Sequence, residues 1–229
     1  MTQPPSLTVG LIVFPGLTQL DLTGPYEVFN RMPNTNVALL ASGSAPVRSE
    51  WGLPIAPDAA FADAPELDVL CVPGGWGVNA MLEDRELLSF LRDRGAGAKY
   101  VTSVCSGALL LGAAGLLRGY RASTHWMSLD LLPLFGAVPV RERVVVDRNR
   151  ITGGGVTAGI DLALVIASQL FGEQVAQEIQ LAIEYDPMPP FTSGSPDNAP
   201  SDVKAAVLRR AEHALAERRT IVKRAALHM

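Results

Sequence analysis

Three strand-like segments of the chain each end in a glycine-containing turn that leads into a stretch with helical spacing. They are residues 7–14 (LTVGLIVF), 67–75 (LDVLCVPGG) and 100–104 (YVTSV). Strands that are apolar throughout, rather than at alternate positions, are typical of parallel sheets covered on both faces. The alternation of such strands with helices predicts an α/β fold, with a mainly parallel sheet and helices on both faces in a flavodoxin-like sandwich.

The remaining segments extend this pattern. We expect strands at 37–42, within 53–61 and at 120–126, a hairpin at 141–155, and helices at 25–31, 78–96, 106–117, 127–135, 157–172 and 173–185. Pro25 suits the first position of its helix, where a missing N–H costs nothing. We predict one domain over residues 1–184. Over residues 185–229 we predict a proline-rich loop and a C-terminal helix that packs on the domain or on a dimer partner.

Composition limits the classes of function. Of the 229 residues 48% are hydrophobic and 18% charged, which favours a large buried core. A net charge of −4 gives no general attraction to nucleic acid or to an anionic membrane. The apolar run near the N-terminus is too short for a signal peptide with its flanks, and two cysteines are too few for a disulfide framework. We therefore expect a cytoplasmic protein with free thiols.

Cys105 stands where the strand at 100–104 meets the next helix. A residue at such a corner has strained backbone angles that aim its side chain at open space, the geometry of a nucleophile elbow. The small Ser106 and Gly107 fit the crowding of this turn. The first turn of the helix points unpaired N–H groups at the sulfur, which predicts a lowered thiol pKa. Most single cysteines are structural, and Cys71, in the middle of a strand, is interpreted in that way.

The loops that follow the other strands supply possible partners, because ligands of open α/β sheets bind at the carboxyl ends of the strands. Asp21 follows the first strand in apolar surroundings, and Gly75 lies in a turn whose backbone N–H groups are free to face a bound atom. His125 and Trp126 follow the short strand at 120–126, and Trp76 follows Gly75. Each of these residues also has a structural interpretation. Gly75 would then form an ordinary turn, His125 would anchor the end of a strand, and Trp76 and Trp126 would pack in the core.

Six stretches in this order resemble the superfamily of PfpI-type proteases and class I glutamine amidotransferases, over about residues 7–184. They are 14–25 (FPGLTQLDLTGP), 68–77 (DVLCVPGGWG), 101–117 (VTSVCSGALLLGAAGLL), 122–126 (ASTHW), 151–164 (ITGGGVTAGIDLAL) and 183–200 (IEYDPMPPFTSGSPDNAP). The last of them extends the match beyond the shared fold. Together they are similar to the isonitrile hydratase branch in particular.

The resemblance implies that Cys105 is a nucleophile, that Asp21 is an acid and base, and that Ser106 stands where the branch usually has threonine. It implies hydration of isonitriles to N-substituted formamides through a covalent thioimidate-like intermediate. Gly75, Ser106, His125 and Trp126 are the expected residues for binding the substrate and stabilising negative charge. No metal and no cofactor is implied, and members of the superfamily are commonly homodimers.

Other functions stay open at this point. A thiol enzyme acting on small aldehydes, like a glyoxalase or deglycase, or a peptidase would need a base beside Cys105. Ser106 is not a base, whereas PfpI-like proteases have histidine there. A third possibility is a redox sensor based on oxidation of Cys105. AraC-type regulators carry a similar corner, but the length after residue 185 disfavours an added DNA-binding region.

Overall fold

The computed structural model describes residues 6–228, and within them the sheet has seven strands in the order β10-β11-β7-β6-β1-β2-β5. All neighbours are parallel except the hairpin of β10 and β11. The strands are β1 (Leu7–Ile12), β2 (Thr35–Ala41), β3 (Val47–Arg48), β4 (Pro54–Ile55), β5 (Ala59–Ala60), β6 (Val69–Val72), β7 (Tyr100–Val104), β8 (Arg121–Ala122), β9 (Val138–Pro139), β10 (Val144–Asp147) and β11 (Arg150–Gly153). The mainly parallel sheet predicted from the apolar strands is thereby confirmed.

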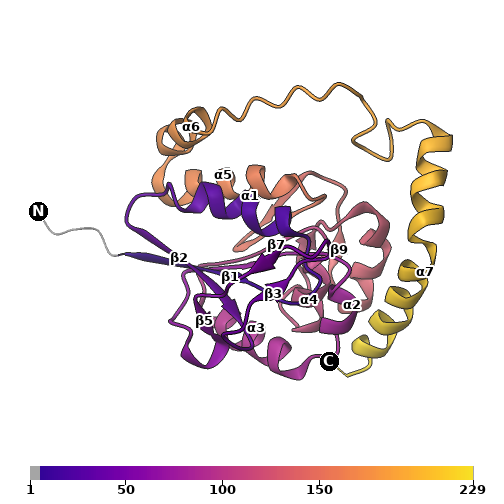
Figure 1. Ribbon diagram of the computed structural model, residues 1–229, viewed down its shortest axis with the longest axis horizontal. Helices are drawn as coiled ribbons and strands as arrows, with labels where there is room; N and C mark the ends of the chain where they lie inside the picture. Colours follow the sequence, from indigo (N-terminus) through magenta and orange to yellow (C-terminus); the bar gives the residue numbers. More distant parts are fainter. Residues whose placement is uncertain (1–5, 229) are drawn as a thin grey trace, which may run out of the picture.

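Helices cover both faces of this sheet, as expected (Figure 1). The α-helices are α1 (Gln19–Phe29), α2 (Val78–Met81), α3 (Arg85–Gly97), α4 (Gly107–Ala113), α5 (Ala158–Phe171), α6 (Glu173–Ala182) and α7 (Ser201–Ala226), and the 3₁₀ helices are η1 (Phe61–Asp63) and η2 (Trp126–Phe135). Helices α1 and α5 pack together on one face, with α6 against α5, while α3 and α4 cover the other. The seven residues of α4 are all buried, because the helix lies between the sheet and a second layer formed by η2 and α7.

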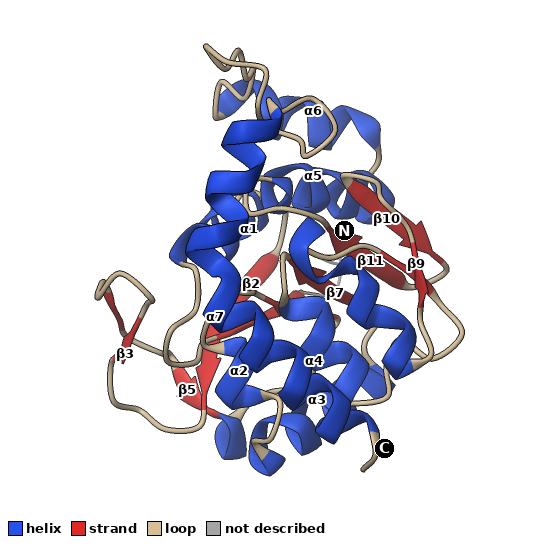
Figure 2. Cartoon of the chain, turned by 90° about the vertical axis from the view of Figure 1, so that its right-hand side faces the viewer, coloured by secondary structure: helices blue, strands red, loops and turns tan. Residues whose placement is uncertain are grey.

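The long helix α7 stands at the side of the molecule towards which the parallel strands run, opposite the start of β1 (Figure 1). In a view from that side it crosses in front of α2 and α4 (Figure 2). Its side chains that are buried, including Ala211, Ile221, Val222 and Ala225, belong to its C-terminal two thirds. The chain reaches this helix by the proline-rich segment after residue 184, which carries the exposed Met188 and Phe191.

Several element boundaries differ from the sequence prediction. The first helix begins at Gln19 rather than at Pro25, so Pro25 lies inside the helix and Asp21 lies in its first turn rather than in a loop. The predicted helix at 78–96 is two helices, because the Asp84 side chain accepts the N–H of Leu87 (2.9 Å) and starts a new helix. The helix expected at 106–117 ends at Ala113.

The strand expected within residues 53–61 and the hairpin expected at residues 141–155 are both present. Residues 54–55 form β4, which pairs with β3 in a small antiparallel hairpin outside the main sheet. The hairpin at 141–155 is present as β10 and β11, with Arg148 at its turn in the left-handed region (φ 56°).

Candidate active site

Three neighbouring strands end at the same place in the molecule. Strands β1, β6 and β7 lie side by side and parallel, so their carboxyl ends share one edge of the sheet. The strand order reverses between β1 and β6, because β2 lies on one side of β1 and the later strands on the other. Such a reversal is where α/β sheets form their ligand crevice. The segments that follow these strands carry Asp21, in the first turn of α1, and Gly75 and Cys105, and the fold brings these three residues together.

Cys105 adopts the strained backbone that the corner predicts. Its φ is 56°, a left-handed conformation that non-glycine residues seldom occupy and that is typical of active sites. Its N–H donates to the carbonyl of Gly153 (3.1 Å), and its own carbonyl accepts the hydroxyl of Thr124 (2.8 Å). Gly107 is required next to it, since a Cβ there would lie 2.2 Å from the carbonyl oxygen of Val72.

Asp21 faces the same point from the first turn of α1. The residue is 0% exposed, and its Oδ2 accepts the N–H of Gly74 (2.9 Å). Its Oδ1 meets no donor at full hydrogen-bond geometry among the described residues, and the thiol of Cys105 is near enough to donate weakly to the carboxylate. Burial raises the pKa of Asp21 to about 7, against the opposing effect of these two donors and with a further rise from the charge of Glu50.

The pKa of the Cys105 thiol is raised well above its usual value, first by burial and then by the neighbouring Asp21 charge. The N–H of Ser106 and the positive charge of Arg218 oppose the rise. The sequence prediction of a lowered thiol pKa is therefore wrong in sign. The residue is 6% exposed, so loss of hydration outweighs the single N–H at the start of a short helix.

These two shifts have one physical consequence. Two anions side by side in a buried site repel, so Asp21 and Cys105 do not both ionise near neutral pH. The pair loses its first proton around the Asp21 pKa of about 7 and then holds one proton between carboxyl and sulfur. Such a pair can deliver a proton from one member while the other acts as a nucleophile or base.

The loop after β6 supplies backbone groups to the same site. Gly75 has a φ of 130°, a conformation that side chains other than glycine rarely adopt. Its N–H donates to the hydroxyl oxygen of Ser106 (3.0 Å), and that hydroxyl lies 3.1 Å from the Gly75 carbonyl, to which it can donate. Ser106 is 1% exposed, so its hydroxyl fixes the glycine loop beside the nucleophile.

His125 and Trp126 lie less directly in this arrangement. His125 is half-buried at the start of η2, where its Nδ1 accepts the N–H of Met127 (3.4 Å). Burial, with the charge of Arg218, lowers the pKa of His125 to about 4, so the imidazole is neutral at pH 7. Trp126 lines a surface hollow with residues of α7. Their predicted contact with substrate stays a prediction.

Arg218 was not among the residues predicted from the sequence. It projects from α7, is 3% exposed, and its Nη2 donates to the carbonyl of Gly75 (2.9 Å). Its guanidinium also lies 4.9 Å from the ring centre of Trp76. The sequence did contain a signal: Ala211, Arg218 and Ala225 are seven residues apart, so Arg218 occupies the apolar face of the C-terminal helix that was predicted to pack on the domain or on a partner.

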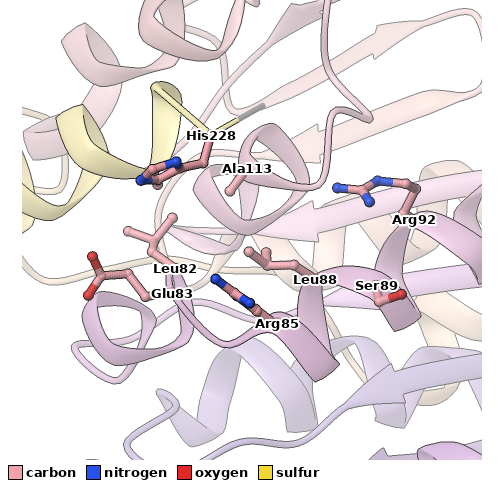
Figure 3. A pocket seen from close by; sticks show the side chains of 9 residues that line it. Leu82, Glu83, Arg85, Leu88, Ser89, Arg92, Ala113 and His228 are labelled. Atoms are coloured by element: carbon pink, nitrogen blue, oxygen red, sulfur yellow. The ribbon is translucent and has the colours of Figure 1, made fainter.

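Other candidate places lack this chemistry. A cavity of about 650 Å³ between α2, α3 and the end of α7 is lined by Glu83, Arg85, Arg92 and His228 among others (Figure 3), but not by Cys105 or Asp21. Among residues 6–228 no group of three His, Cys, Asp or Glu side chains is placed to hold a metal ion. No helix in the described part of the chain has the length and apolar character needed to cross a membrane.

The chain is therefore an α/β protein with a strained cysteine between a buried strand and a helix and a buried carboxyl beside that cysteine. The DJ-1/PfpI family profile matches residues 8–169, and the chain belongs to that family. The superfamily inferred from the sequence is thus confirmed.

Individual relatives agree with this assignment. The chain is 53% identical to the isonitrile hydratase of Pseudomonas putida over 96% of its own length and 97% of that protein. A crystal structure of a ThiJ/PfpI family protein from Pseudomonas syringae matches with a TM-score of 0.93 and 44% identity, covering 96% of this chain and 92% of that one. The transcriptional regulator GbdR of Pseudomonas aeruginosa is 31% identical over 77% of this chain, which spans about half (49%) of that regulator.

Proposed function

We propose that the chain is an enzyme, a lyase that adds water to isonitriles and releases N-substituted formamides. The observation that carries this proposal is its 53% identity to an isonitrile hydratase over nearly the full length of both proteins. The buried Asp21–Cys105 pair supports it, because the reaction needs a nucleophile and a proton donor at the same carbon.

In the first step the Cys105 thiolate attacks the terminal carbon of R–N≡C and forms a C–S bond. Asp21, in its protonated form, gives its proton to that carbon, which leaves a thioimidate, R–N=CH–S–Cys105, and an Asp21 carboxylate. A carboxyl whose pKa is raised to about 7 is suited to this role, since the one proton that the pair shares above this pH can lie on Asp21 while the sulfur attacks.

In the second step the Asp21 carboxylate takes a proton from water as the hydroxide adds to the thioimidate carbon. Asp21 passes this proton to the nitrogen, the C–S bond breaks, and Asp21 takes up the hydroxyl proton, which yields R–NH–CHO and the Cys105 thiolate. Asp21 ends protonated, as it began. Atoms balance as one isonitrile and one water per formamide, and the reaction needs no oxidant and no cofactor.

The loop after β6 would hold the charge that develops on the way. We assign the Gly75 N–H and the Ser106 hydroxyl to this role, with His125 and Trp126 lining the substrate side. The neutral state of His125 suits a pocket for an isonitrile, which offers few hydrogen-bonding groups.

We also propose that the protein is a homodimer, in which residues 185–200 and the start of α7 contact the partner. Met188 and Phe191 are 91% and 78% exposed, and Val203 and Val207 of α7 are exposed as well. Burial of these side chains against a second copy would remove apolar surface from water. Light scattering on the full chain checks this, and a monodisperse monomer would overturn it. The two free thiols favour a reducing compartment, and we assign the protein to the cytoplasm.

The test of the main proposal is product formation from a matched pair of substrates. The protein is mixed with an aryl isonitrile or with the corresponding aryl nitrile, in which the carbon and nitrogen are exchanged, and products are identified by mass spectrometry. We expect formamide from the isonitrile, no product from the nitrile, and loss of turnover after iodoacetamide treatment. Turnover of methylglyoxal without turnover of any isonitrile would move the assignment to aldehyde chemistry.

A further inference from the structure

Arg218 is a buried cation whose hydrogen bonds all go to neutral groups. Its Nε donates to Asn79 Oδ1 (2.7 Å), its Nη1 to Ser128 Oγ (3.1 Å) and its Nη2 to the Gly75 carbonyl (2.9 Å). The contrast on the same helix is Arg224, which pairs with Glu83 (2.9 Å) at the surface. Within the described residues Arg218 has no carboxylate in an ion pair, although a buried charge is costly unless it is compensated.

The groups around Arg218 show what compensates its buried charge. Burial lowers the pKa of Arg218, and the Cys105 sulfur and Glu50 are the two anionic groups that oppose this effect. Glu50 is half-buried and reaches the N–H of Trp76 at 3.4 Å. His125, at the start of η2, is a neutral ring whose pKa is lowered by burial and by the charge of Arg218, and Glu217 on α7 itself accepts the amide N–H of Asn79 (3.2 Å). The charge of Arg218 therefore acts on the nucleophile as well as on Glu50.

A direct chain of contacts joins Arg218 to the nucleophile. The Gly75 carbonyl that receives Nη2 also lies 3.1 Å from the Ser106 hydroxyl, and the Gly75 N–H donates to that same hydroxyl (3.0 Å). Ser106 directly follows Cys105. The fork of Arg218 thus fixes the peptide orientation of a glycine whose φ of 130° leaves it free to turn.

We propose that Arg218 is a positioning residue of the active site, which holds the Gly75 loop in place and whose buried charge favours the singly ionised state of the Asp21–Cys105 pair. The C-terminal helix α7 is then part of the site rather than a covering element. The positive charge opposes the rise that burial imposes on the Cys105 pKa. The proposal rests on the function proposed above. It concerns the reactivity of the Cys105 sulfur, however, and that reactivity can be measured without any isonitrile.

The test compares Arg218→Met, which removes the charge and the hydrogen bonds, with Arg218→Lys, which keeps the charge. Arg224→Met on the same helix is the matched control. The readouts are the pH profile of Cys105 alkylation by iodoacetamide, followed by peptide mapping, and kcat and KM for formamide formation. Thermal melts identify variants that retain the fold, and if Arg218→Met does not fold, Arg218→Gln replaces it.

We expect Arg218→Met to move the midpoint of Cys105 alkylation up by about one pH unit, the lower end of what loss of a nearby opposite charge produces. Arg218→Lys should keep the midpoint but lower kcat, because lysine cannot bind three acceptors in a plane. Arg224→Met should change neither. An unchanged midpoint in a folded Arg218→Met or Arg218→Gln variant, or an equal shift in Arg224→Met, would overturn the proposal. If no isonitrile is turned over at all, the alkylation profile still decides the role of Arg218.

Discussion

The two cysteines of this chain lie on neighbouring strands and are both buried, yet their surroundings differ. Cys71 is in the middle of β6, is 0% exposed, and burial raises its pKa to about 12. Cys105 follows the last residue of β7, in a strained left-handed conformation beside Asp21. The comparison shows that burial alone does not decide the chemistry of a thiol. The position of the thiol at the carboxyl edge of the sheet decides its chemistry, because the segments that follow the strands supply a proton donor, Asp21, at that edge.

Substitutions of Cys105 and Cys71 should differ most in their effect on turnover. Replacing Cys105 by Ala should lower kcat/KM at least about 10³-fold, since the nucleophile is removed. Replacing Cys71 by Ala should leave kcat/KM close to that of the unmodified protein, because its sulfur faces the core. Formamide formation by the two variants in parallel measures this. Equal losses in both would contradict the assignment of the nucleophile.

Asp21 marks the second difference between the two cysteines, since it is within hydrogen-bond reach of Cys105 but acts on Cys71 only through its charge. Asp21→Asn should lower kcat by about 10²- to 10⁴-fold, the usual contribution of a positioned acid and base. Asp68→Asn is the matched control, because Asp68 is also a partly buried carboxylate that accepts a backbone N–H (Thr8, 2.8 Å) but lies at the amino end of the strands. A similar loss of kcat in both variants would mean that folding, rather than proton transfer, is affected.

The Ser106 hydroxyl should have an intermediate effect. Ser106→Ala removes the partner of the Gly75 N–H and should lower kcat by up to about 10²-fold, as loss of one oriented group at an oxyanion does. Ser106→Thr keeps the hydroxyl and should retain most of the activity. The KM and kcat of the two variants separate the hydroxyl from the size of the side chain. Full activity of the Ser106→Ala variant would show that the Ser106 hydroxyl does not contribute to catalysis.

The sequence determines much of this architecture, and its limits have physical causes. Strand β7 and the corner at Cys105 could be located because a short strand-like segment followed by small residues leaves few alternatives. The start of α1 was placed six residues late, since Pro25 is favoured at a first helical position and its local signal outweighed the packing of α1 on α5. Arg218 was missed because its spacing with Ala211 and Ala225 indicates only a buried helix face, whereas its contact with Gly75 joins residues 143 positions apart.

The smallest expected effect is on stability. Cys71→Ala removes a sulfur packed in the core of β6 and should lower the free energy of unfolding by about 1 kcal/mol, a typical cost for one core truncation. Cys71→Ser should cost more, since it also buries a hydroxyl. Chemical denaturation of both variants measures this. A loss of stability without a loss of turnover would show that Cys71 is structural, unlike Cys105. A loss of turnover in the folded Cys71→Ala protein would contradict this difference between the two cysteines.

The central claim, that Asp21 and Cys105 share one proton, is tested most directly by the pH dependence of Cys105 alkylation in the unmodified protein and in Asp21→Asn. Below pH 7 the pair holds both protons, and above it one is lost, so reactivity should rise through a step near the Asp21 pKa of about 7. In Asp21→Asn this step should be absent, and reactivity should rise only above the ordinary thiol range, because the buried thiol must then ionise alone. A step near pH 7 that persists in Asp21→Asn would show that the two groups titrate independently and would contradict the account.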